Sequence, residues 1–148
     1  DDPQMAKTIG ADGVHLGQSD MDPLDARKIL GENAIIGLST NNIHQALSAP
    51  IDILSYLACG PVFQSNSKSG HAEPIGLDGV RQITSSVDFP FVAIGGINLG
   101  NAATVFQSGA RSVAMIEEVY RNRAKLPEFK REIDASMSKF AVPTPCNL

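Results

Sequence analysis

Residues 92–98 read Val92-Ala93-Ile94-Gly95-Gly96-Ile97-Asn98, and this stretch decides the fold class. It ends an apolar run and is followed by apolar residues at helical spacing over 102–106. A strand, a glycine turn and a helix in that order are typical of one unit of a parallel α/β fold. Glycines allow close approach to the backbone, and N–H groups in such a turn can bind an anion. The stretch therefore predicts a phosphate-binding turn, with a plain tight turn as the alternative.

The same alternation of short apolar strands and helical patterns covers most of the chain. Near-continuous apolar strands suit a parallel sheet that is buried on both faces. We expect five βα units in one domain over residues 1–140, followed by a C-terminal tail at 141–148. The predicted strands are 14–16, 34–38, 53–58, 89–94 and 113–116, and the predicted helices are 3–8, 23–30, 42–48 (capped by Asn41 or Asn42), 77–85, 101–108 and 127–139.

Composition excludes several classes of function. The chain has 148 residues with a net charge of −4, no Trp and two Tyr, which argues against a nucleic-acid surface. Its apolar runs are far shorter than the roughly 18 residues of a membrane-spanning helix. Cys59 and Cys146 make no disulfide framework, so we expect a reducing, cytoplasmic location. Because the sequence opens in mid-motif without Met, we also expect a piece of a longer protein.

Polar residues gather where the predicted strands end, which is the functional edge of parallel α/β folds. Asp20 could instead begin a helix, Ser39 could be a turn residue, and His15 is better explained as packed and hydrogen-bonded than as catalytic. The loop over 65–68 offers hydroxyls and an ammonium group, which suit phosphate, with an ordinary polar loop as the alternative. The residues at this edge are His15, Gln18, Asp20, Ser39, Thr40, Ser65, Ser67, Lys68, Gly96 and Asn98.

Five separate motifs together resemble the thiamine phosphate synthase family. They keep the order of the family's motifs and nearly their spacing, and the resemblance covers residues 1–119. The matching segments are 10–20 (Gly-Ala-Asp-Gly-Val-His-Leu-Gly-Gln-Ser-Asp), 36–40 (Ile-Gly-Leu-Ser-Thr), 60–63 (Gly-Pro-Val-Phe) with Ser67 and Lys68, 74–77 (Pro-Ile-Gly-Leu) and 93–97 (Ala-Ile-Gly-Gly-Ile).

The resemblance implies a (β/α)8 TIM barrel, here an N-terminally truncated part with about five βα units, strands four to eight. It implies a transferase of thiamine biosynthesis that joins 4-amino-2-methyl-5-hydroxymethylpyrimidine diphosphate to a thiazole phosphate and releases pyrophosphate. We expect these two small molecules as partners, with no nucleic acid and no membrane, and we leave homo-oligomer formation open.

The resemblance also implies roles for individual residues. Asp1 and Asp20 are the implied ligands of Mg²⁺, whose preferred partners are carboxylate and phosphate oxygens. Lys68, which meets the diphosphate, and Ser39, which lies beside the pyrimidine, are the implied catalytic residues, and both bind substrate. The other implied substrate-binding residues are Ser65, Asn66, Ser67, Gly96, Ile116 and Glu117.

The chain departs from the family pattern at several places. The diphosphate clamp Gln-x-Arg-x-Lys is absent, 53–55 resembles a small insertion, and two loop threonines are replaced by Ser65 and Ser67. Where the family has a serine after the last strand, this chain has Glu117. A carboxylate repels a bound phosphate unless it turns away or meets a cation.

Two other functions remain open from the sequence. A thiazole tautomerase shares the barrel without the full metal pair, so Asp1, Asp20 and Lys68 favour the synthase over it. A non-catalytic module that binds a phosphate ligand is favoured by Glu117 and by the absent strands. We expect the 148-residue chain to be inactive alone and prone to association, because open sheet edges pair with other chains.

Overall fold

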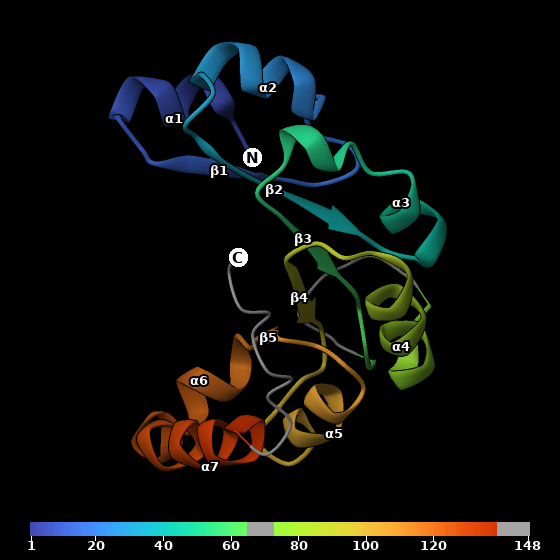
Figure 1. The fold of residues 1–148 in the computed structure, drawn as a ribbon. Coiled ribbons are helices and arrows are strands. Elements are labelled where there is room, and N and C mark those ends of the chain that lie inside the picture. The colour runs from blue at the N-terminus through green and yellow to red at the C-terminus, as the bar shows by residue number, and fades with distance from the viewer. Residues whose placement is uncertain (65–72, 139–148) are drawn as a thin grey trace, which may run out of the picture.

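A five-stranded parallel sheet forms the centre of the computed structural model, which describes residues 1–64 and 73–138. The strands lie in the sheet in the same order as in the chain, and every neighbouring pair is parallel (Figure 1). This confirms the predicted α/β class, while the tail at 141–148 lies outside the described residues. The strands are β1 (Gly13–Leu16), β2 (Ile35–Thr40), β3 (Tyr56–Cys59), β4 (Phe91–Ile94) and β5 (Ser112–Ala114).

Helices connect successive strands and lie along the outer side of the curved sheet (Figure 1). Asn42 rather than Asn41 caps the third helix, because its side chain accepts the Gln45 N–H at 2.9 Å. No described helix is long and apolar enough to cross a membrane. The helices are α1 (Pro3–Ile9), α2 (Pro23–Leu30), α3 (Ile43–Leu47), α4 (Gly76–Ser86), α5 (Ala102–Gln107), α6 (Glu117–Arg121) and α7 (Leu126–Ser138), with 3₁₀ turns η1 (Ile51–Ile53) and η2 (Arg123–Lys125).

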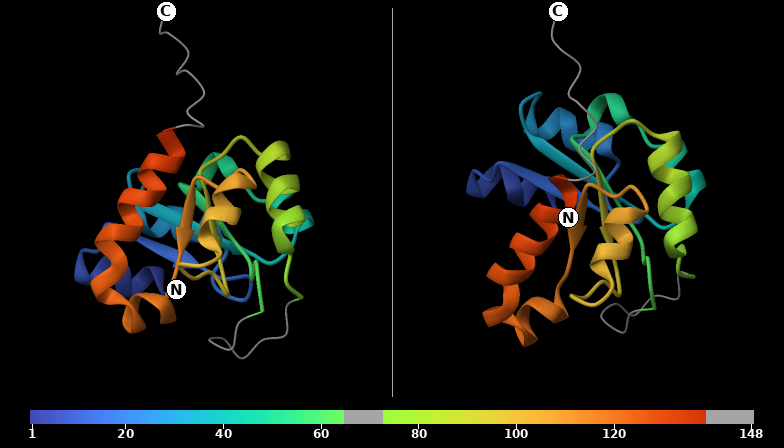
Figure 2. Two further views of the ribbon diagram at one scale, coloured as in Figure 1. Left: turned by 90° about the horizontal axis from the view of Figure 1, so that it is seen from below. Right: turned by 60° about the horizontal axis from the view of Figure 1, so that its bottom comes forward.

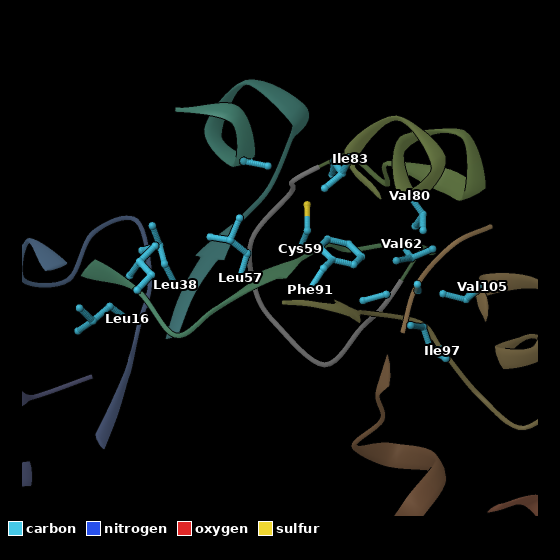
Figure 3. Packing of buried hydrophobic residues seen from close by; sticks show 14 of the residues in the cluster. Leu16, Leu38, Leu57, Cys59, Val62, Val80, Ile83, Phe91, Ile97 and Val105 are labelled. Atoms are coloured by element: carbon cyan, nitrogen blue, oxygen red, sulfur yellow. The ribbon is translucent and has the colours of Figure 1, made fainter. Parts of the chain in front are cut away.

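The two faces of the sheet differ in chemistry because successive side chains of a strand point to opposite faces. One face packs on the helices and forms the core, as Leu57 and Cys59 of β3 do with Ile83 of α4 (Figure 3). The alternate residues of the same strands form the inner face, which includes the half-buried His15 and Ser39. The inner face therefore carries the polar side chains of His15 and Ser39, while the buried Thr40 lies on the core face.

Two predicted strands differ from the structure. The segment predicted as strand at 53–58 begins with the 3₁₀ turn η1, and β3 starts only at Tyr56. The buried guanidinium of Arg27 explains this: it donates to the Ile53 carbonyl oxygen from Nε and Nη2 and so holds the segment in a turn. The strand predicted at 113–116 ends at Ala114, and α6 follows. A helix of five residues is too short for its periodicity to be read.

Candidate active site

The carboxyl ends of the five strands bring the predicted site residues to one edge of the sheet. Asp20 follows β1, Ser39 is the next-to-last residue of β2, Gly96 follows β4, and Ile116 and Glu117 follow β5. The predicted residues Ser65, Asn66, Ser67 and Lys68 lie outside the described residues.

Asp20 presents a carboxylate at this edge. Its Oδ2 accepts the Gly17 N–H at 2.6 Å, while its Oδ1 bonds to no described residue and the side chain is exposed. Asp1 is also exposed and precedes Asp2, the N-cap of α1. The N-terminus overlaps β5 in Figure 2 but lies beside β1 and β2 in Figure 1. Of the two predicted metal ligands, Asp20 is at the carboxyl edge, and the place of Asp1 there stays a prediction.

The donor set at this edge suits Mg²⁺ better than a metal held by protein alone. No group of three or more His, Cys, Asp or Glu side chains in residues 1–64 and 73–138 is placed to hold a metal ion. Mg²⁺ is usually bound by one or two carboxylates together with substrate phosphates and water. The exposed oxygens of Asp1 and Asp20 fit that mode of binding.

Ser39 is held by two residues of the neighbouring strand and its loop. Its carbonyl oxygen accepts a hydrogen bond from Gln18 Nε2 at 2.7 Å, and its Oγ lies 2.8 Å from His15 Nε2. The other ring nitrogen of His15, Nδ1, lies 2.9 Å from the Tyr56 hydroxyl. His15 is therefore hydrogen-bonded, as predicted. Tyr56 was missed by the sequence analysis, because only the register between strands shows that it meets His15.

The turns after β3 and β4 pack backbone against backbone. A Cβ on Gly60 would lie 2.0 Å from the Ile94 carbonyl oxygen, and one on Gly95 would lie 2.6 Å from Pro61 Cα. The Val62 N–H donates to Ile94 O at 2.9 Å, and the Phe63 N–H donates to Gly95 O at 3.1 Å. Only glycines fit this approach, and Gly95 also has a φ of 94° that favours glycine.

The chain on either side of residues 65–72 is fixed to the same turn. The Ile75 N–H donates to Pro61 O at 2.9 Å, and the Gly76 N–H donates to Val62 O at 3.0 Å. Residues 61–64 and 75–76, on either side of that segment, therefore lie together beside Gly95 and Gly96.

The Gly95-Gly96 turn is fixed by side chains, and one of its backbone donors has no partner among the described residues. Asn101 Nδ2 donates to the Gly96 carbonyl oxygen at 3.0 Å, and Asn98 Oδ1 accepts the Gly100 N–H at 2.8 Å. The Gly96 N–H has no hydrogen-bond partner among the described residues. Backbone N–H groups that are not fully exposed are rarely left without a partner. A ligand atom that accepts a hydrogen bond fits this position.

Glu117 meets a cation. Its carboxylate forms an exposed ion pair with the Arg121 guanidinium one turn along α6. Ile116, just before it, is 53% exposed. A carboxylate that is paired with a cation repels a nearby phosphate less, and Arg121 is that cation for Glu117.

Comparisons with known proteins agree on one family. The family model for thiamine monophosphate synthase matches residues 1–119. A thiamine-phosphate synthase of Chloroflexus aurantiacus is 46% identical over 115 residues, covering 78% of this chain and 53% of the relative. One of Clostridium novyi is 44% identical over 118 residues, covering 80% and 58%.

A solved structure gives the same result. Thiamine phosphate pyrophosphorylase from Pyrococcus furiosus superposes with a TM-score of 0.75 at 37% identity, covering 90% of this chain and 66% of that one. The chain spans about half the length of the curated relatives it matches. On the family model and these relatives, the chain belongs to the thiamine monophosphate synthase family.

Proposed function

We propose that the protein containing this chain is a thiamine phosphate synthase. It joins 4-amino-2-methyl-5-hydroxymethylpyrimidine diphosphate to a thiazole phosphate and releases pyrophosphate. One observation carries the proposal: a carboxylate (Asp20), a fixed hydroxyl (Ser39) and an available backbone donor (Gly96 N–H) share the carboxyl edge of a parallel sheet. These are the groups that a diphosphate, a pyrimidine and a phosphate need.

We further propose that residues 1–140 form one domain whose five βα units are strands four to eight of a (β/α)8 barrel. The strand order, the helices on the outer side and the likeness to the Pyrococcus furiosus structure support this. In such barrels the turns after strands seven and eight often bind phosphate. The corresponding turns here are those of Gly95-Gly96 and Ile116-Glu117.

The reaction has two requirements. The diphosphate leaving group must be stabilised, and the thiazole nitrogen must be brought to the methylene carbon of the pyrimidine. The bond between the pyrimidine's methylene carbon and the diphosphate oxygen breaks, and the thiazole nitrogen lone pair forms the new C–N bond. Ser39 orients the pyrimidine, and the Gly96 N–H with Ser65, Asn66 and Ser67 holds the thiazole phosphate. The Lys68 ammonium balances charge on the leaving diphosphate, an interaction that is strongest in the transition state.

Asp1 and Asp20 would hold Mg²⁺, because both side chains are exposed and that of Asp20 is at the edge where the diphosphate would lie. When bound, Mg²⁺ neutralises phosphate charge. The thiazole nitrogen is neutral, so no general base is required.

The test measures thiamine phosphate formed from both substrates with Mg²⁺. It uses the 148-residue chain and a chimera in which residues 1–119 replace the matching segment of the Chloroflexus aurantiacus synthase. We expect turnover by the chimera, and loss of turnover when either substrate is omitted. A folded chimera that binds both substrates and yields no thiamine phosphate would contradict the proposal and favour a binding module.

A further inference from the structure

We propose that Tyr56 and His15 are positioning residues that fix the Ser39 hydroxyl as a hydrogen-bond donor toward the ligand. The inference rests on the proposed function, in which Ser39 contacts the pyrimidine. It adds two residues to the site and states which kind of ligand atom would bind to the Ser39 hydroxyl.

The contact between His15 and Tyr56 depends on Gly37, which has no side chain. His15 pairs in register with Gly37, and Gly37 pairs with Tyr56, so the three residues form a row across β1, β2 and β3. A Cβ on Gly37 would lie 2.2 Å from Tyr56 Cζ and 2.6 Å from His15 Nδ1. The two rings therefore meet in the space that Gly37 leaves, stacked with centroids 5.5 Å apart.

Ser39 lies two residues beyond Gly37 and so on the same face of β2, nearer to the carboxyl edge. The imidazole of His15 bridges the two hydroxyls, with Nδ1 2.9 Å from Tyr56 Oη and Nε2 2.8 Å from Ser39 Oγ. The hydrogen-bonded series Tyr56–His15–Ser39 thus runs from the first residue of β3 toward the carboxyl end of β2.

The direction of the hydrogen bonds follows from acidity. A neutral imidazole donates from one nitrogen and accepts at the other. A phenol is the stronger acid and an aliphatic hydroxyl the better acceptor, so Tyr56 donates to Nδ1 and the Nε2–H donates to Ser39 Oγ. Within residues 1–64 and 73–138, Tyr56 Oη has no other hydrogen-bond partner to take its proton.

Ser39 Oγ then already accepts one hydrogen bond, and its own proton is left to be donated. The Gln18 bond to the Ser39 carbonyl oxygen fixes the backbone, so the hydroxyl turns only about its own Cα–Cβ and C–O bonds. A ligand acceptor at this point, such as an unprotonated ring nitrogen of a pyrimidine, would take the Ser39 proton.

The direct test is ¹⁵N NMR of the imidazole nitrogens in the full chain, with His44 as the exposed reference ring. We expect the Nε2–H tautomer at His15 and loss of that preference in Tyr56→Phe. An Nδ1–H tautomer in the unmodified chain would overturn the proposal. This readout needs no turnover, so it fails or succeeds independently of the proposed function.

The second test separates the two substrates in the active chimera. Tyr56→Phe and His15→Ala should each raise the KM for the pyrimidine diphosphate about tenfold, the worth of one hydrogen bond, and leave the KM for the thiazole phosphate unchanged. His15→Gln should recover part of the loss, since its amide nitrogen can reach the place of Nε2. Equal changes in both KM values, or no recovery by His15→Gln, would show a structural role only.

Discussion

Gly60 lies so close to Ile94 that a Cβ on the glycine would be 2.0 Å from the Ile94 carbonyl oxygen. The contact is between two backbones, and the Val62 N–H donates to the same oxygen at 2.9 Å. The position of the turn after β3 is therefore set by the backbone at the end of β4 rather than by the side chains of the turn.

Gly60→Ala should destabilise the fold by about 3 kcal/mol or more, because a backbone carbonyl cannot rotate out of the way as a side chain can. The midpoint of urea unfolding measures this. Gly10→Ala is the control: Gly10 has a positive φ of 67°, which Gly60 does not have, and a Cβ there meets nothing within 4 Å. Its cost should stay near 1 kcal/mol. Equal costs for the two variants would show that the contact with Ile94 relaxes freely.

Arg27→Met should cost about 3 kcal/mol or more, since hydrogen bonds to charged groups contribute about 1.5–3 kcal/mol each. The Arg27 side chain is buried and donates to four carbonyl oxygens, those of Gly31, Glu32, Ala34 and Ile53. Lys28→Ala on the same helix loses only an exposed pair with Asp25 and should leave the melting temperature nearly unchanged. Thermal unfolding of the two variants decides whether Arg27 holds η1 in place.

Asp20→Ala should abolish Mg²⁺-dependent turnover in the chimera. Asp20→Asn is the sharper variant, because its amide oxygen can still accept the Gly17 N–H while the charge is lost. We expect Asp20→Asn to keep its melting temperature and lose most of its activity. Full activity of Asp20→Asn at ordinary Mg²⁺ concentrations would remove Asp20 from the metal site.

Arg121→Ala should raise the KM for the thiazole phosphate, because it leaves the Glu117 carboxylate without its ion-pair partner near the proposed phosphate turn. The double variant Glu117→Ser with Arg121→Ala should restore the KM. Steady-state kinetics with each substrate varied in turn would measure both effects. A double variant no better than Arg121→Ala would show that Arg121 itself, and not the exposed Glu117 charge, matters.

Cys59 gives the protein a pH dependence. Burial raises the pKa of this thiol above its ordinary value, although hydrogen bonds from Thr40 and the Gly60 N–H oppose the shift. The folded state therefore binds the thiol proton more tightly than the unfolded state. The resulting stability is complete below the unfolded pKa of about 8.5 and is lost as pH rises through the higher folded value.

The urea midpoint of the unmodified chain should accordingly fall faster than that of Cys59→Ala as pH rises above the unfolded thiol pKa of about 8.5. Only the slopes are compared, since Cys59→Ala also loses packing at every pH. Parallel slopes would show that the thiol does not contribute.

The sequence predicted the fold well where a single strand or helix carries its own signal. The helix 23–30, bounded by Pro23 and Gly31, agrees with α2, and the glycine turn after residue 94 is where it was expected. The strand predicted at 53–58 begins too early. The first residues of the segment are held in a turn by Arg27, which lies 26 positions before Ile53 in the chain. Contacts of this kind have no local pattern.

The position of several candidate site residues in the sheet was predicted to the same extent, while their roles stay predictions. Asp20, Ser39 and Gly96 could be found because each follows or ends a strand, and the carboxyl ends of parallel strands share an edge. Tyr56 could not, since its partnership with His15 depends on the absent side chain of Gly37 and on a register that no single segment shows. The pairing of Glu117 with Arg121 depends on α6, a helix too short to predict.

The strand order has a consequence for how the sheet can assemble. Each strand pairs only with the strands before and after it in the chain, so the sheet can grow by adding one βα unit at a time. The pairing of Leu57 with Phe91 closes a longer stretch of chain than the pairing of Gly37 with Tyr56 or of Val92 with Ser112. Loop closure costs more entropy as the loop lengthens, although only logarithmically. The pairing of Gly13 with Ile35 also closes a shorter stretch. Joining β3 to β4 is therefore the step of assembly with the largest entropic cost, and shortening the connection between them should speed folding more than shortening any of the other three.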